Sequence, residues 1–331
     1  MTVVLLVVAF VLIVVGAFLF TNSVEWAGQR LDLAHGAVGS LLAAVATALP
    51  ESTIPVVALV KGSAPPEQAI AIGAIIGAPF LLATLALALV GVSAHVFERR
   101  RDQDRRIDAQ LQTGQRDFVF FLAFFGLALV VGAIGADTPI RIAVALILVV
   151  AYVTYSYLTI RRSGVAEEEE PSPLYFDWTR DDPPSGFQLV LQLVVSIAAI
   201  IGGAELFVTE IEHVATSLGV PLLVLALVLA PLATELPEKL NSVIWVRSGK
   251  DSLALGNITG AMVFQASVPV AFGLAFTPWL LDPAALVAGV VGLLGGALGF
   301  WRLHRRNFGR PYQLVWVALY LAFLAYTLFL G

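Results

Sequence analysis

The chain alternates between long runs of apolar residues and short polar stretches that contain proline, glycine or charged residues. A helix of about 20 apolar residues crosses the hydrocarbon core of a bilayer, which is roughly 30 Å thick. The runs are too long and too continuously apolar for the alternating strands of a membrane β-barrel, so they predict helices. Ten spans are expected, at residues 2–27, 35–60, 68–92, 117–136, 139–160, 187–215, 219–246, 252–276, 284–302 and 312–330.

The composition also indicates a membrane protein. Apolar residues make up 59% of the chain and charged residues 13%, whereas soluble domains have about 45–50% and about 25%. The absence of cysteine excludes disulfides and thiolate metal ligands. We therefore predict an all-α polytopic membrane protein that has the lipid bilayer as a partner, binds no nucleic acid, and has an oligomeric state that the sequence leaves open.

The basic residues are distributed unevenly among the predicted loops. Of the 19 Lys and Arg residues, sixteen lie in loops that follow odd-numbered spans or at the adjoining span ends, and two lie in or next to the other loops, while Lys239 alone lies well inside a span. Cytoplasmic loops are enriched in Lys and Arg. Both termini are therefore expected outside the cell.

The two halves of the chain resemble each other. A shift of 187 positions places Leu49-Pro50-Glu51 on Leu236-Pro237-Glu238, and a shift of 183 positions places Gly77 on Gly260. Because each half holds five spans, the second half is expected to enter the membrane from the opposite side. Such inverted repeats, with interrupted helices and a site near the midplane, are typical of secondary transporters.

The duplication divides the chain into a first five-helix repeat at residues 1–162 and an inverted second repeat at residues 187–331. Residues 163–186 between them form an acidic, proline-rich linker, expected on the cytoplasmic side. Blocks of like charge are usually disordered, so a solvated tether is expected. Calcium sensing by its seven acidic residues is the alternative.

Each Leu-Pro-Glu motif places a proline and a carboxylate inside an apolar span. A proline inside a helix cannot donate its backbone hydrogen bond, so Pro50 frees the carbonyl of Ala46 and Pro237 frees that of Ala233. Discontinuous helices are therefore expected at both motifs. An ionisable group inside the membrane is costly, and Glu51 is by default a functional candidate.

The two motifs together offer a set of oxygen donors that suits a hard cation. Calcium takes about 6–8 oxygen ligands with flexible geometry, whereas magnesium requires a strict octahedron. Zinc and copper prefer His or Cys clusters, which the sequence lacks. We expect a site for a transported cation, with calcium as the main candidate and no bound cofactor. Its donors are the carboxylates of Glu51 and Glu238, the carbonyls of Ala46 and Ala233, and the hydroxyls of Thr47 and Thr234.

Further polar residues lie near the second motif. Glu235 and Lys239 are four residues apart and face one side of a helix. Glu235 is expected at the ion site and Lys239 is expected to act as a tethered counter-cation; the alternative is that Lys239 extends to the cytoplasmic interface. Glu205, Asn257 and Gln265 are additional candidates for coupling, although buried amides also often join helices.

The segments Ala46–Glu51 and Ala233–Glu238, followed by Gly256-Asn-Ile-Thr-Gly260, resemble the two α-repeats of the cation/calcium exchanger superfamily, specifically its sodium/calcium exchanger branch. The resemblance covers both five-helix halves. It implies alternating-access antiport of calcium against sodium or protons, with the motif glutamates Glu51 and Glu238 as the central ligands. A prokaryotic cell membrane is the expected location.

The sequence departs from the pattern of this family at positions that would serve sodium. The serine of the typical Gly-Thr-Ser-Leu-Pro-Glu motif is replaced by Ala48 and by Glu235. The polar or acidic ligand further along is replaced by Leu82 in the third span and by Gln265 in the eighth. A calcium-type site is therefore more firmly expected than sodium coupling.

Three other functions are considered beside this antiport. A membrane-embedded enzyme would use Glu51 and Glu238 as an acid/base pair, but the sequence offers no Ser–His pair or zinc-binding histidine set. A channel is disfavoured, because paired carboxylates beside broken helices indicate a site that closes on alternate sides. A proton-coupled transporter of another cation remains open. A transporter, and not an enzyme, is expected.

Overall fold

The protein is described by a computed structural model, and the described part of the chain is helical apart from short connections. Within it there is no strand, which agrees with the predicted all-α fold. The described residues are 2–30, 50–97, 111–162, 172–178, 183–305 and 312–329, with the backbone alone for 111–112, 160–162, 236–238 and 241.

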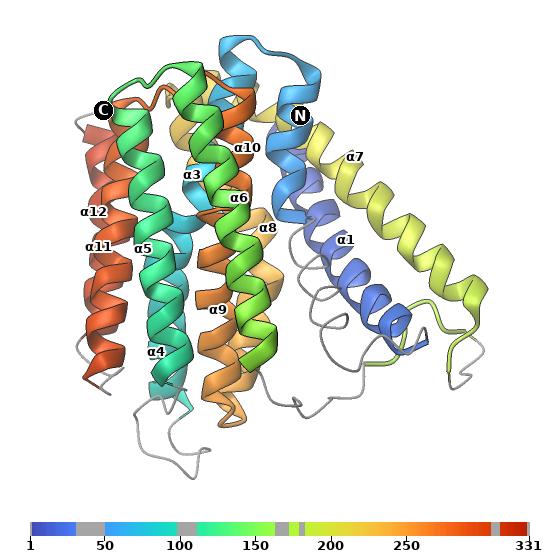
Figure 1. Cartoon of the computed structure of the whole chain (residues 1–331). Coiled ribbons are helices and arrows are strands. Elements are labelled where there is room, and N and C mark those ends of the chain that lie inside the picture. Colours follow the sequence, from blue (N-terminus) through green and yellow to red (C-terminus); the bar gives the residue numbers. More distant parts are fainter. Residues whose placement is uncertain are drawn as a thin grey trace.

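The helices form two series, one from each half of the chain (Figure 1). The first series is α1 (Thr2–Arg30), a helix of residues 50–61, α3 (Pro65–Leu81), the π-helical segment η1 (Leu82–Ala86), α4 (Leu87–Val96), α5 (Leu111–Ala133) and α6 (Thr138–Arg162). The second series is α7 (Gly186–Leu218), α8 (Leu222–Arg247), α9 (Asp251–Gln265), α10 (Val268–Phe276), α11 (Pro283–His304) and α12 (Tyr312–Phe329).

Eight helical stretches of the described chain are long and apolar enough to cross a bilayer, and each coincides with a predicted span. The expected span 35–60 is described only from residue 50 onward. The span 219–246 is filled by α8. A multi-pass membrane protein is thereby confirmed, while the ten-span inverted repeat stays a prediction.

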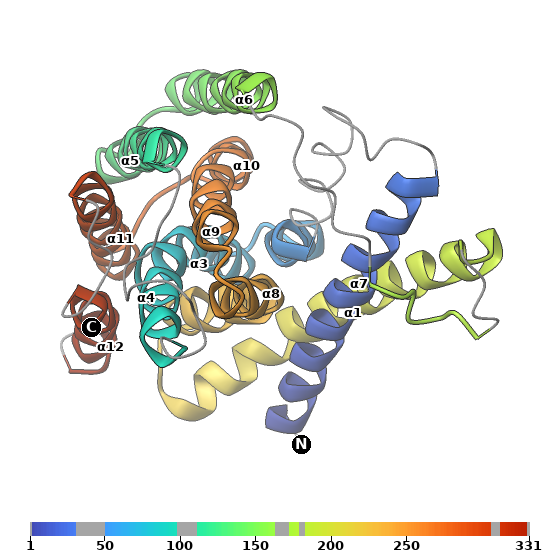
Figure 2. The same cartoon turned by 90° about the horizontal axis from the view of Figure 1, so that it is seen from below.

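Helices of the first half pack against helices of the second half. α5 packs on α9 and α11 packs on α3, while α6 packs on α10 and α12 packs on α4. α1 and α7 pack mainly on each other and cross the remaining bundle at an angle (Figures 1 and 2). The start of α1 and the end of α12 lie at the same end of the bundle (Figure 1), as an even number of crossings requires.

The break expected at the second Leu-Pro-Glu motif is wrong, because α8 runs through Pro237 without interruption. A proline removes a single helical hydrogen bond, and neighbouring helices can hold a membrane helix together around it. α3 lies tightly against α8, since a side chain at Gly77 would collide with the carbonyl oxygen of Leu227. At the first motif, Leu49 lies outside the described residues, and Pro50 is the first described residue of the helix of residues 50–61.

The third span is continuous but changes from α-helical to π-helical hydrogen bonding where α3 passes into η1. The hydroxyl of Thr84 donates to the carbonyl of Phe80 at 2.6 Å and so competes with the backbone for that acceptor. Such π-helical turns inside α-helices often occur at functional sites.

The eighth span is interrupted between α9 and α10. The hydroxyl of Ser267 donates to the carbonyl of Val263 at 2.6 Å. Pro269, at the start of α10, has no N–H to donate to the carbonyl of Gln265. The last residue of α9 is therefore held at a break in the helix, inside the bundle.

Part of the linker between the halves is held against α1 and α7. The indole N–H of Trp26 in α1 donates to the carbonyl of Ser172 at 2.8 Å, and the N–H of Phe176 donates to Oε1 of Gln192 in α7 at 2.9 Å. Buried side chains of both helices thus hold the backbone of residues 172–176, while Ser172, Pro173 and Tyr175 are exposed, and the role of the linker stays a prediction. The acidic run at residues 167–170 lies outside the described part.

Candidate cation site

Three elements bring polar side chains together inside the bundle. Glu51 lies in the helix of residues 50–61, Glu235 lies in α8, and Gln265 is the last residue of α9. Their exposed fractions are 7%, 0% and 1%. The site therefore combines a carboxylate from the first half of the chain with a carboxylate and an amide from the second.

The amide of Gln265 joins the two carboxylates. Its Nε2 donates to Oε2 of Glu51 and to Oε1 of Glu235 at 3.2 Å. Buried carboxylates require such partners, because transfer out of water is costly for an unpaired charge. Rotation of the side-chain amide by about 180° places Oε1 where Nε2 now lies. Gln265 can therefore donate a hydrogen bond to the carboxylates through Nε2 or bind a cation through Oε1.

Glu235 also forms an ion pair within α8. Nζ of Lys239 lies 2.8 Å from Oε2 of Glu235, and the two side chains are 7% and 0% exposed. This geometry does not match the alternative in which Lys239 extends to the cytoplasmic interface. Breaking such a buried pair by removing one partner is strongly destabilising, because the other charge is left uncompensated.

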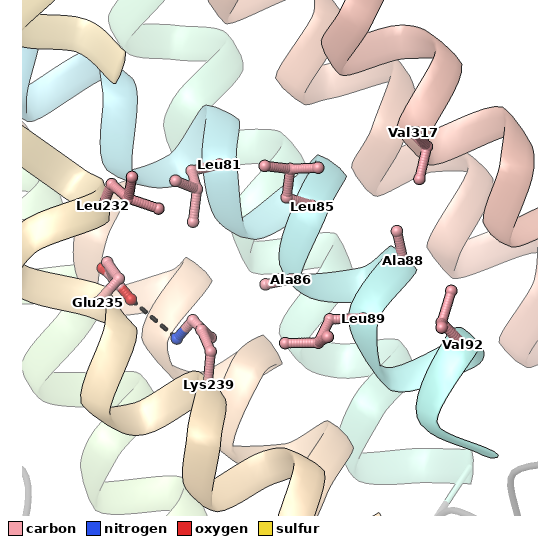
Figure 3. A pocket seen from close by; sticks show the side chains of 10 residues that line it. All are labelled: Leu81, Leu85, Ala86, Ala88, Leu89, Val92, Leu232, Glu235, Lys239 and Val317. Atoms are coloured by element: carbon pink, nitrogen blue, oxygen red, sulfur yellow. Dashed lines mark ion pairs between the residues drawn. The ribbon is translucent and has the colours of Figure 1, made fainter. Parts of the chain in front are cut away.

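A cavity of about 300 Å³ lies beside this ion pair, between α8, the α3–η1–α4 span and α12. Glu235 and Lys239 lie on one side of it, and apolar residues such as Leu85 and Leu89 lie across from them (Figure 3). Among the lining residues only these two carry charge. The pair therefore faces an apolar space and not a polar path.

Two other predicted donors lie in α8 next to Glu235. Ala233 and Thr234 are buried, and the hydroxyl of Thr234 donates to the carbonyl of Ala230 at 3.3 Å. The hydroxyl oxygen keeps lone pairs that can accept or bind a cation. The role of the Ala233 carbonyl stays a prediction.

Several predicted ligands lie outside the described part of the chain. These are Ala46, Thr47 and the side chain of Glu238, so their contribution to the site stays a prediction. Within the described residues, no group of three acidic or histidine side chains is placed to hold a metal ion.

Two of the additional candidates are not brought into contact with the joined carboxylates in the described structure. Nδ2 of Asn257 donates to the hydroxyl of Ser242 at 3.2 Å, which joins α9 to α8. The side chain of Glu205 is exposed, and its backbone carbonyl accepts from Nζ of Lys61 at 3.0 Å.

One buried acid near the site was not among the sequence-based candidates. Asp117 in α5 accepts from the hydroxyl of Tyr155 in α6 at 2.9 Å and from the hydroxyl of Thr259 in α9 at 2.7 Å. It therefore ties α9, the helix that ends at Gln265, to α5 and α6. The available signal was an acidic residue at the first position of a predicted span, directly after Arg116.

Comparison with known proteins shows similarity over nearly the whole chain. The family model described as sodium/calcium exchanger protein matches residues 1–161 and 188–329. The membrane protein MJ0091 of Methanocaldococcus jannaschii is 24% identical over 315 residues, which cover 95% of this chain and 94% of that protein. CaxA of Alkalimonas amylolytica is 26% identical over 179 residues, which cover 52% of this chain and 56% of CaxA.

Solved structures share the fold. The crystal structure of the H⁺/Ca²⁺ exchanger CAX aligns with a TM-score of 0.77 at 21% identity, covering 100% of this chain and 82% of that chain. A structure of the sodium-calcium exchanger NCX_Mj aligns with a TM-score of 0.62 at 21% identity, covering 98% of this chain and 97% of that chain. At these identities the likeness shows a common fold.

Proposed function

The chain belongs to the sodium/calcium exchanger protein family, and we propose that it is a secondary antiporter that exchanges calcium, or a similar divalent cation, for sodium or protons. Membership of this family favours transport over a membrane-embedded enzyme. The exchanged ions are the cargo of the protein, and the proposal requires no cofactor.

The observation that carries the proposal is the buried contact between Glu51 and Gln265. It joins a carboxylate of the first half to an amide of the second half, away from water. Carboxylate and amide oxygens are ligands that calcium prefers. We infer that Glu51 is the central ligand and that Gln265 turns its Oε1 toward the bound ion.

The remaining ligands are proposed from the sequence. Glu238 is the second motif carboxylate, and the first motif adds Thr47 with the carbonyl of Ala46. In α8 the corresponding donors are Thr234 and the carbonyl of Ala233. Hard oxygen donors from both motifs would provide the coordination number of about 6–8 that calcium takes.

A site assembled from both halves suits alternating access. Movement of one set of helices against the other changes which side of the membrane reaches the site, while the ion stays close to the midplane. Exchange follows if the protein changes sides only when an ion is bound.

Calcium uptake into sealed vesicles that contain the purified full chain tests this proposal. A sodium gradient and a pH gradient are imposed separately, and calcium entry is followed with a calcium-sensitive dye. We expect at least one gradient to drive uptake. Glu51→Gln should lower that uptake at least about tenfold, because a charged ligand is lost. Glu212→Gln, at an exposed glutamate of α7, is the matched control and should leave uptake unchanged.

The same assay separates the alternatives. Calcium entry that depends on its own gradient alone would indicate a channel. Gradient-driven movement of another cation, with no calcium transport, would indicate a proton-coupled transporter of that cation. Unchanged calcium uptake by Glu51→Gln would contradict the proposed site.

A further inference from the structure

The ion pair of Glu235 and Lys239 introduces a fixed positive charge beside the proposed cation site. The ammonium group lies 2.8 Å from one carboxylate oxygen of Glu235, and the amide of Gln265 occupies the other oxygen at 3.2 Å. The same amide also donates to Glu51, so it connects the ion pair to that carboxylate. Lys239 is thus separated from the proposed central ligand by two side chains.

The surroundings hold the two charges together. The cavity on the other side of the pair is lined by apolar side chains of the α3–η1–α4 span and by Val317 of α12 (Figure 3). An ammonium or a carboxylate left alone against such a wall would be costly. Each group therefore neutralises the other, and Glu235 is already charge-compensated without a bound ion.

The pair belongs to the second half only. Displacement by 187 positions places Glu235 on Ala48 and Lys239 on Ser52, so the first half has neither charge at the equivalent positions. The duplication therefore does not require this pair, and it is an addition to the repeated architecture at the point where the site is built.

We propose that Lys239 is a built-in cation, which takes the place beside Glu235 that a second, free cation would otherwise take. This inference rests on the proposed antiport. It adds to that proposal what neutralises each carboxylate. The transported ion neutralises Glu51, whereas the ammonium group of Lys239, a fixed part of the chain, neutralises Glu235. The number of monovalent ions bound per cycle is lower by one than it would be without the charge at position 239.

Three variants separate the charge of Lys239 from its packing. Lys239→Gln removes the positive charge, Lys239→Arg keeps it, and Glu235→Gln combined with Lys239→Gln removes both charges. Sodium binding to each purified full chain is measured by titration calorimetry at constant pH, and calcium binding is measured in parallel. Lys250→Gln, at an exposed lysine that precedes α9, controls for loss of a positive charge elsewhere.

We expect Lys239→Gln to bind about one more sodium ion per chain than the wild type, because a buried carboxylate without its partner favours a cation in the vacated position. Lys239→Arg and the double variant should bind sodium as the wild type does.

Two results would overturn the inference: equal sodium binding by Lys239→Gln and the wild type, or extra sodium binding by the double variant. If Lys239→Gln does not fold, Lys239→Met, which also removes the charge and keeps Glu235, takes its place, and equal sodium binding by that variant and the wild type would overturn the inference. The proposed function fails separately, through an absence of calcium exchange by the wild type in vesicles. Sodium binding by the variants is read from protein in detergent and does not depend on that transport.

Discussion

The third and the eighth predicted spans each depart from a regular α-helix, the third at the π-helical segment η1 and the eighth at the break between α9 and α10. Leu82 begins η1 and Gln265 ends α9, and the two residues are 183 positions apart, the displacement that also pairs Gly77 with Gly260. Both side chains are buried. Leu82 packs in the apolar core, whereas Gln265 donates to Glu51 and Glu235.

This difference shows that two spans with an irregular turn can carry different chemistry. The side chain at the irregular turn decides whether that turn serves the site. A leucine offers no ligand atom. The described site therefore takes its amide from the second half, and the first half contributes the carboxylate of Glu51.

Replacing the glutamine of the eighth span by the leucine of the third should have the largest effect on transport. Gln265→Leu makes the eighth span resemble the third and removes the hydrogen bonds to both carboxylates. Because two buried charges lose a partner, we expect calcium exchange to fall at least about tenfold. Vesicle uptake measures the loss, and the thermal midpoint in detergent shows whether the variant remains folded.

The reverse change, Leu82→Gln, is the matched control. It places an amide in the apolar core and should lower stability by about 1–3 kcal/mol, while exchange per folded molecule stays within about twofold of the wild type. If Leu82→Gln abolished exchange and Gln265→Leu did not, the assignment of the amide to the second half would be wrong.

A smaller effect is expected from loosening α9 without touching the site. Asp117→Leu leaves the hydroxyls of Tyr155 and Thr259 without their shared acceptor, and should lower stability by about 2 kcal/mol. Exchange should fall severalfold because Gln265 is then less well positioned. Calcium affinity and exchange rate, measured separately, test this account: loss of stability with unchanged exchange would assign Asp117 a purely structural role.

The smallest effect is expected in the third span. The hydroxyl of Thr84 bonds only to carbonyls of its own turn among the described residues. Thr84→Val keeps the shape of the side chain and should change the stability by at most about 1 kcal/mol, with unchanged exchange. A large loss of exchange would show that the π-helical segment η1 matters to transport in its own right.

Much of the fold was predictable from the sequence, because long apolar runs have few alternatives in a membrane. The position of each irregular turn was not. Pro237 indicated a break in α8, yet that helix continues, since tight packing on α3 can support a helix through one missing hydrogen bond. The irregular turns at Leu82 and Gln265 depend on hydroxyl groups of Thr84 and Ser267 that compete for backbone carbonyls, which hydropathy does not register.

The site was predictable in part. The spacing of Glu235 and Lys239 indicated that they share one face of a helix, and the structure places them in contact. Gln265 was a candidate because it stands where the family has a polar ligand. Its link to Glu51 was not predictable, because it depends on how three helices meet. Asp117 was missed because its two partners lie 38 and 142 positions away.

The most direct test of the central claim is calcium self-exchange. Vesicles that contain the purified chain are loaded with unlabelled calcium and placed in radioactive calcium at equal concentration, with no gradient of sodium or pH. We expect the wild type to take up label, Glu51→Gln to take up at least about tenfold less, and Glu212→Gln to match the wild type. Absence of label uptake by the wild type, or equal uptake by Glu51→Gln, would contradict calcium exchange at Glu51.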